Sequence, residues 1–175
     1  PGGHPYYVIV EASGMDAARD EEFFTVLMGN WLEDGLVADA VIASSEGQRQ
    51  AIWAIREDIA GLMQLLLPAA IFDVSLPICA MESYVDGLVG AVAAEWGSDA
   101  RIIIFGHLGD GNLHIGIAPR PWSEGARHRA EELVYGPLAA IHGSISAEHG
   151  IGLEKRAWLH LSRTAEEVAT MRLLT

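Results

Sequence analysis

The chain has 175 residues, of which 50% are hydrophobic and 20% are charged, and this composition is typical of a single folded domain and not of a disordered chain. Its 24 Asp and Glu residues outnumber its 11 Lys and Arg residues, and the resulting formal charge of −13 disfavours binding to the phosphate backbone of nucleic acid. Cys79 is the only cysteine, so no internal disulfide can form, and we expect a cytoplasmic protein.

The N-terminal part of the chain predicts two strands with a helix between them. Residues 6–11 (YYVIVE) are rich in β-branched and aromatic side chains and are expected to form a strand, as are residues 36–43 (LVADAVIA). Between them, apolar residues recur at helical spacing over residues 20–33. Gly35 marks the end of this helix.

A second helix is expected over residues 46–66. It begins after Ser45, and Gln48 follows three residues later, a spacing at which the two side chains can satisfy free amides at a helix start. The apolar run of residues 59–72 is too short to span a bilayer and contains Pro68, so no transmembrane segment is predicted.

The rest of the chain alternates strands with helices. Strands are expected over residues 71–76, 101–108 and 113–118. Helices are expected over residues 78–96, 124–135 and 138–142, with a last helix that opens at Thr164 and Glu167. Turn residues 109–112 connect the strands expected over residues 101–108 and 113–118 into a hairpin. Because a hairpin is antiparallel, a purely parallel doubly wound sheet is excluded, and we predict an α+β fold.

The predicted hairpin carries two histidines. A loop centred on Asp110 and Gly111 would place His107 and His114 directly opposite each other on one face of the sheet. Opposed Cβ atoms lie about 4.5–5.5 Å apart, and two imidazoles at this separation can bind one metal ion. The same pair could instead stack or hydrogen-bond, and the loop glycines could serve the turn alone.

A second polar segment follows at residues 144–155. Glu148 offers a carboxylate and His149 a titratable imidazole, while Gly150 and Gly152 allow a tight turn of the backbone. Two His and one Glu would leave coordination positions open, as expected of a catalytic metal. Ordinary surface exposure of Glu148 and His149 is the alternative.

Arg56 is a candidate for binding a small carboxylate, because a guanidinium can donate two parallel hydrogen bonds. Arg49, Trp53 and Arg56 also share one helix face. A solvated or salt-bridged helix face is therefore the alternative for Arg56.

These segments together resemble a known family. Four stretches carry the resemblance: WAIRE (53–57), FDVSLP (72–77), GHLGDGNLH (106–114) and SISAEHGIG (144–152) followed by Lys155. They are similar to the C-terminal domain of FAD-linked oxidases, a group that contains D-2-hydroxyglutarate, D-lactate and glycolate dehydrogenases. The resemblance implies that residues 1–175 form one α+β substrate domain related to a ferredoxin-like sandwich, an antiparallel sheet with helices packed on it. An N-terminal FAD-binding domain, on which such a domain packs, would then be absent from this chain.

The resemblance also implies roles for individual residues. His107, His114 and Glu148 would bind a divalent metal, commonly zinc. His149 would be the general base, and Arg56 would bind a substrate carboxylate. FAD would be bound mainly by the missing domain, so the chain alone is expected to be inactive.

Two positions depart from the hydroxyglutarate-type pattern. Ile71 stands where those members commonly have a Lys, and Gly116 stands where they have an Asn. Both positions help those members to bind substrate. The departure therefore disfavours a dicarboxylate with a second anionic end.

The expected function is oxidation of a D-2-hydroxy acid to a 2-oxo acid with hydride transfer to flavin. The expected partners are this substrate, the covalently linked FAD-binding domain and an electron acceptor that the sequence does not identify; a homodimer is left open. Two other functions stay open. One is a metal-dependent hydrolase that uses the same two His and one Glu to activate water, and the other is a non-catalytic binding module.

Overall fold

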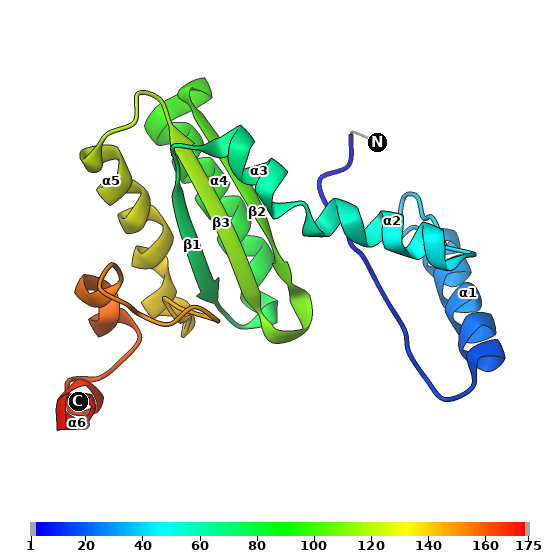
Figure 1. The fold of residues 1–175 in the computed structure, drawn as a ribbon. Helices are drawn as coiled ribbons and strands as arrows, with labels where there is room; N and C mark the ends of the chain where they lie inside the picture. The colour runs from blue at the N-terminus through cyan, green and yellow to red at the C-terminus, as the bar shows by residue number, and fades with distance from the viewer. Residues whose placement is uncertain (1–2, 174–175) are drawn as a thin grey trace. The chain divides into compact units, whose positions relative to one another are not determined.

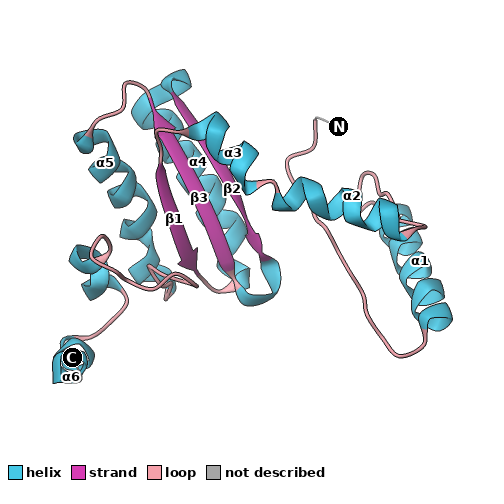
Figure 2. Ribbon diagram, in the orientation of Figure 1, coloured by secondary structure: helices cyan, strands magenta, loops and turns pink. Residues whose placement is uncertain are grey.

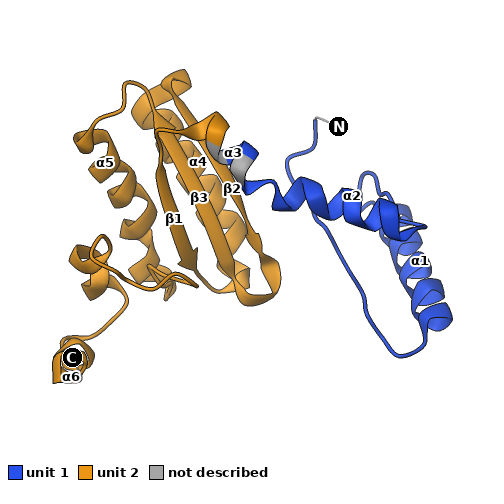
Figure 3. Cartoon of the chain, in the orientation of Figure 1, with its two compact units in different colours: residues 1–62 blue, residues 63–175 orange. Residues whose placement is uncertain are grey.

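The computed structural model describes residues 3–173, apart from the side chains of Ala60 and Met63. The chain divides into two compact units, Pro1–Leu62 and Met63–Thr175 (Figure 3). Within the described range, no helix is both long enough and apolar enough to cross a lipid bilayer.

The first unit is helical. Its helices are α1 (Ala17–Glu33) and α2 (Glu46–Glu57). A third helix, α3 (Ile59–Leu66), begins in the first unit and ends in the second. The predicted helix over residues 20–33 is confirmed and starts earlier, because Asp16 caps it by accepting a hydrogen bond from the Arg19 amide at 3.2 Å. Gly35 follows α1 in the left-handed conformation, with φ of 70°, as its predicted end requires.

The predicted helix over residues 46–66 is interrupted. Ser45 caps α2 as expected, accepting from the Gln48 amide at 3.3 Å. Asp58 leaves the helical conformation with ψ of 57°, and its side chain accepts from the Gly61 amide at 2.9 Å. A short acidic side chain that bonds its own backbone competes with helix continuation, so Asp58 ends α2 and begins α3.

The two strands predicted in this unit are wrong. Residues 6–11 and 36–43 form no strand in the described part of the chain. Their apolar side chains are exposed, for example Val8 at 71% and Val41 at 81%. Side-chain composition indicates only that a segment suits a sheet, and a strand also needs a partner for its backbone groups.

The second unit is built on an antiparallel sheet of three strands, β1 (Ala70–Ser75), β2 (Ala100–His107) and β3 (Asn112–Pro119), in the order β1-β3-β2 (Figures 1 and 2). Helix α4 (Met81–Trp96) packs against β2, and α5 (Glu124–Tyr135) packs against β1. This arrangement confirms the α+β prediction and the hairpin. The last helix is α6 (Ala165–Leu173), and its cap is reciprocal: the Thr164 amide donates to Glu167, and the Glu167 amide donates to Thr164.

The core lies between one face of the sheet and the helices α4 and α5. Side chains from all three elements are almost fully buried there, among them Phe72, Val74, Leu88, Ile115, Ile117 and Val134. Because side chains alternate along a strand, the residues between these face the opposite side of the sheet. That opposite face carries Asp73, Asn112 and His114.

The chain order β1-α4-β2-β3-α5 with β3 between β1 and β2 is the order of a ferredoxin-like sandwich. The free edge of β1 is where that fold places its last strand. Ser144 forms an isolated antiparallel bridge with Ser75 at this edge, and each amide donates to the other's carbonyl, at 2.7 and 3.1 Å. This bridge ties the segment after α5 to the sheet.

The hairpin register differs from the prediction by one residue in the position of the loop. Leu108–Asp110 form a 3₁₀ turn and Gly111 adopts a φ of 70°, so His107 lies opposite Asn112 and His114 lies opposite Phe105. The directly opposed histidine pair is therefore wrong. Moving the loop centre by one residue shifts each cross-strand partner by two, which keeps both histidines on the same face as diagonal neighbours. Their ring centroids are 6.1 Å apart.

Candidate metal centre

Three potential metal ligands converge at the loop end of the hairpin. His107 ends β2, His114 lies in β3, and Glu148 comes from the segment after the bridge at Ser144. One ligand atom from each of the three lies within 4.8 Å of the others. His114 is half-buried, whereas His107 and Glu148 are exposed, so the site opens to solvent. Two imidazoles and one carboxylate are a donor set that catalytic zinc sites use.

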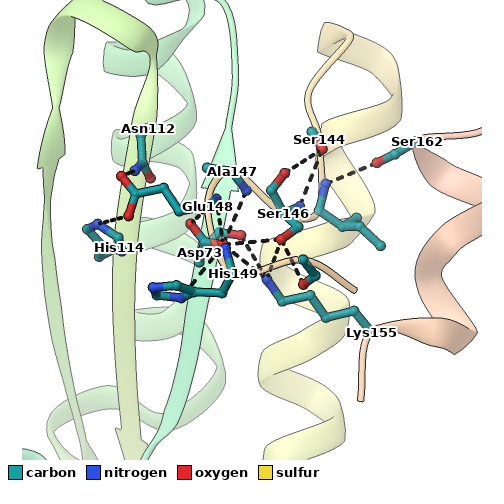
Figure 4. Close-up of polar contacts among 12 residues, drawn as sticks. Asp73, Asn112, His114, Ser144, Ser146, Ala147, Glu148, His149, Lys155 and Ser162 are labelled. Carbon is teal, nitrogen blue, oxygen red and sulfur yellow. Dashed lines mark hydrogen bonds and ion pairs between the residues drawn. The ribbon is translucent and has the colours of Figure 1, made fainter. Parts of the chain in front are cut away.

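A buried carboxylate, Asp73, holds the segment that carries Glu148. Asp73 lies on β1 and is 3% exposed. It accepts hydrogen bonds from the successive backbone amides of Ala147, Glu148 and His149 at 3.2, 3.1 and 3.0 Å (Figure 4). Three amides aimed at one carboxylate fix the backbone locally, and they place Glu148 beside the hairpin.

Lys155 and Ser146 complete the surroundings of Asp73. The Lys155 ammonium donates to the Asp73 carbonyl at 3.1 Å and lies 3.4 Å from its Oδ2, while the Ser146 hydroxyl donates to Oδ2 at 3.2 Å. The Ser146 hydroxyl oxygen also lies 2.8 Å from the Gly150 carbonyl oxygen, so its single proton is shared between Asp73 and Gly150, and this contact closes the loop on itself. The buried negative charge is therefore paired and hydrogen-bonded, as a buried charge must be.

The surroundings change the pKa of two of these groups. Burial, the largest influence on Asp73, raises the pKa of its carboxyl, but the amide bonds from His149 and Glu148 and the charge of Lys155 together outweigh burial and lower the pKa. Burial also lowers the pKa of His114, against the opposing effect of Glu148 and Asp73. A lowered pKa keeps His114 neutral near pH 7, and the neutral imidazole is the form that ligates a metal.

His149 lies next to the three ligands. Its side chain is 68% exposed, and its ring centroid is 5.9 Å from that of His114. Its Nδ1 lies 3.8 Å from Asp73 Oδ2, and its backbone amide donates to the same oxygen. The residue is thus anchored by its backbone while its ring faces the solvent-accessible side of the site.

The family comparison decides what kind of domain this is. The family model described as the C-terminal domain of FAD-linked oxidases matches residues 1–174. The chain belongs to this family. The predicted resemblance is thereby confirmed, and the sheet, the hairpin and the anchored segment are features of an FAD-linked oxidase C-terminal domain.

Curated relatives agree with the family. The domain is 37% identical to a D-2-hydroxyglutarate dehydrogenase of Xanthomonas citri pv. viticola over 97% of this chain and 36% of that protein. It is 36% identical to a mitochondrial D-2-hydroxyglutarate dehydrogenase of Arabidopsis thaliana over 95% of this chain and 29% of the relative. A mitochondrial protein of Schizosaccharomyces pombe, whose assignment as a D-lactate dehydrogenase is itself provisional, is 34% identical over 98% of this chain and 34% of its own length. The FAD-linked oxidase C-terminal domain thus spans about a third of these relatives.

Of the predicted site residues in this domain, the structure brings His107, His114, Glu148 and His149 together. Arg56 lies on α2, in the first unit, and its role stays a prediction. On the same helix, Arg49 forms an ion pair with Glu46 at 2.7 Å.

Sequence reasoning missed the roles of Asp73 and Asn112. Asp73 is the one charged residue of β1, and a charge inside an apolar strand was the available signal for it. The sequence pattern predicts only a turn role for Asn112. It is 1% exposed, and its Nδ2 donates to Glu148 Oε1 at 2.6 Å.

Proposed function

We propose that this chain is the substrate- and metal-binding domain of an FAD-dependent dehydrogenase that oxidises a D-2-hydroxy acid to a 2-oxo acid. The observation that carries the proposal is the convergence of His107, His114 and Glu148, with His149 beside them, in a domain of the FAD-linked oxidase family. The FAD-binding part would be a separate domain of the same polypeptide, in agreement with relatives about three times as long as this chain.

The metal we propose is zinc, held by His107, His114 and Glu148. The donor set fits a catalytic zinc site, and three protein ligands leave room for a substrate. When bound, a divalent metal supplies a positive charge that lowers the pKa of a hydroxyl group placed against it. The lowered pKa of His114 favours the neutral imidazole that such a site needs.

The chain's own residues would bind the substrate and move one proton. His149 is the proposed general base for the C2 hydroxyl: Asp73 lies 3.8 Å from Nδ1, so this arrangement leaves Nε2 to meet the substrate proton. Arg56 is proposed to bind the C1 carboxylate, on the resemblance of its WAIRE stretch. When bound by its own domain, FAD supplies the acceptor for the hydride.

The substrate is proposed to lack a second carboxylate. Ile71, Gly116 and Ile103 lie opposite one another across the three strands, two residues from the row that contains His114. Two residues of a strand span about 7 Å, so this row is the next one on the site's face of the sheet. Ile71 is 48% exposed, and the row carries no charge that could pair with a distal carboxylate.

The test is flavin reduction by the full-length flavoprotein that contains this chain. We expect the flavin absorbance to bleach on mixing with D-lactate or another D-2-hydroxy acid. Treatment with a metal chelator is expected to remove most of this rate, and added Zn²⁺ is expected to restore it. The proposal fails if none of the acids bleaches the flavin, or if the chelated protein keeps its rate. Ester or amide hydrolysis by the chain with added Zn²⁺ would instead favour the hydrolase.

A single substitution tests the substrate proposal. Ile71→Lys in the full-length flavoprotein is expected to raise the ratio of kcat/KM for D-2-hydroxyglutarate over D-lactate by about 10- to 100-fold, because a charge-assisted hydrogen bond contributes about 1.5–3 kcal/mol. Ile71→Met is the matched control, since it changes shape and keeps the row apolar. A wild-type protein that already prefers D-2-hydroxyglutarate would contradict the proposal.

A further inference from the structure

Asn112 occupies a position from which it can act on the metal ligands. It is the first residue of β3, directly opposite His107 on β2, and two residues before His114. Alternation along the strand places its side chain on the same face as both histidines. Its backbone amide donates to Asp110 Oδ1 at 3.2 Å, which anchors the residue at the end of the turn.

The side chain of Asn112 restrains Glu148, one of the two exposed ligands. Glu148 is 47% exposed, so without a contact its carboxylate could adopt several rotamers. Asn112 Nδ2 donates to Glu148 Oε1 at 2.6 Å, a short bond (Figure 4). The other oxygen, Oε2, lies 3.9 Å from His114 Nε2. The amide therefore engages one carboxylate oxygen, and the second oxygen faces a histidine ligand.

The two polar atoms of the Asn112 side chain differ in their hydrogen bonding: Nδ2 donates to Glu148, whereas Oδ1 accepts no bond from the described residues. Its Oδ1 is buried and has no hydrogen-bond partner in the described part of the chain. An unpartnered buried acceptor destabilises a fold, and an apolar side chain of the same shape would avoid that cost. Stability alone therefore does not explain an amide at this position, whereas the bond to Glu148 does.

We propose that Asn112 is a positioning residue of the metal centre: its Nδ2 fixes Glu148 so that one carboxylate oxygen is presented to the metal together with His107 and His114. The proposal rests on the metal centre proposed above. In this proposal Asn112 acts on the metal only through Glu148. The effect of Asn112 on Zn²⁺ affinity is therefore expected to disappear once residue 148 no longer carries a carboxylate. This dependence separates positioning from a general structural role in the hairpin.

The experiment is a double-mutant cycle on Zn²⁺ affinity, measured by competition with a chromophoric chelator. The four proteins are the chain as it stands, Asn112→Leu, Glu148→Gln and the double variant. Asn112→Leu is expected to weaken Zn²⁺ binding by about 10- to 100-fold, the usual range for a residue that orients a metal ligand. In the Glu148→Gln background the same change is expected to alter the affinity by less than about twofold.

Each outcome has a distinct meaning. An equal loss in both backgrounds would overturn the proposal and assign Asn112 a structural role. An Asn112→Leu protein that binds Zn²⁺ as tightly as the unchanged chain would also overturn it, because Asn112 would then have no effect on the metal site. If the unchanged chain binds no Zn²⁺, the metal centre itself fails, and the positioning role fails with it. Because Leu could disturb the hairpin, Asn112→Ser, which is smaller and polar, repeats the cycle. Thermal unfolding of the four metal-free proteins monitors folding.

Discussion

Replacing His107 and His114 together by Ala is expected to abolish metal binding by the chain and to lower 2-hydroxy-acid oxidation by the full-length flavoprotein about 1,000-fold. The magnitude follows because a catalytic metal supplies several kcal/mol of transition-state stabilisation, and about 4 kcal/mol corresponds to three orders of magnitude in rate. The double variant keeps only one of the three ligands, the Glu148 carboxylate, because both nitrogen donors of the site are removed. Metal content by plasma mass spectrometry and flavin bleaching measure the two effects.

A matched control removes two imidazoles elsewhere. His128 and His160 are exposed, and neither belongs to the group of three ligands. The double variant His128→Ala with His160→Ala is expected to keep both the metal and the activity. A His107→Ala, His114→Ala protein that retains stoichiometric metal would show that the ion binds elsewhere, and one that retains full activity would show that the ligands are not needed for catalysis.

The hairpin site could be predicted because its signals are local. His107 and His114 share one face because a hairpin in this register opposes residues whose numbers have an odd sum, and moving the loop centre by one whole residue keeps that parity. The structure changed the pairing from opposed to diagonal without separating His107 from His114. Glu148 is proposed as a third ligand from its carboxylate chemistry and from the resemblance, because 34 residues of chain after His114 give no local rule for where it folds back.

The parts that sequence reasoning missed depend on contacts distant along the chain. Asp73 is bound by amides 74 to 76 residues later, and Asn112 by a carboxylate 36 residues later. Neither relation has a periodicity that a sequence pattern can reveal. The strands predicted over residues 6–11 and 36–43 failed for the same reason: their side chains suit a sheet, but strand formation depends on a partner that the pattern does not specify.

Asp73→Asn is expected to lower the free energy of unfolding by about 3 kcal/mol, the cost of removing one partner from a buried, hydrogen-bonded ion pair. The side chain keeps its shape, but its new NH₂ group faces backbone amides that also donate, and Lys155 loses its counter-charge. The segment that carries Glu148 and His149 then loses its anchor, so Zn²⁺ affinity is expected to fall as well. Urea unfolding and chelator competition measure the two changes.

Asp99→Asn is the matched control, because Asp99 is exposed in the same unit and the change in the free energy of unfolding is expected to stay within about 0.5 kcal/mol.

The pH dependence of stability gives a second, independent test. The pKa of Asp73 is lowered in the folded state, so the unfolded chain binds the proton more tightly. The stability from the ionised carboxylate is thus complete above the unfolded pKa of about 3.9 and is lost as pH falls through the lower folded pKa. The difference in free energy of unfolding between the unchanged protein and Asp73→Asn should therefore be constant from neutral pH down to about pH 5 and become smaller below about pH 4. A gap that narrows near neutral pH instead would assign the stabilisation to another group.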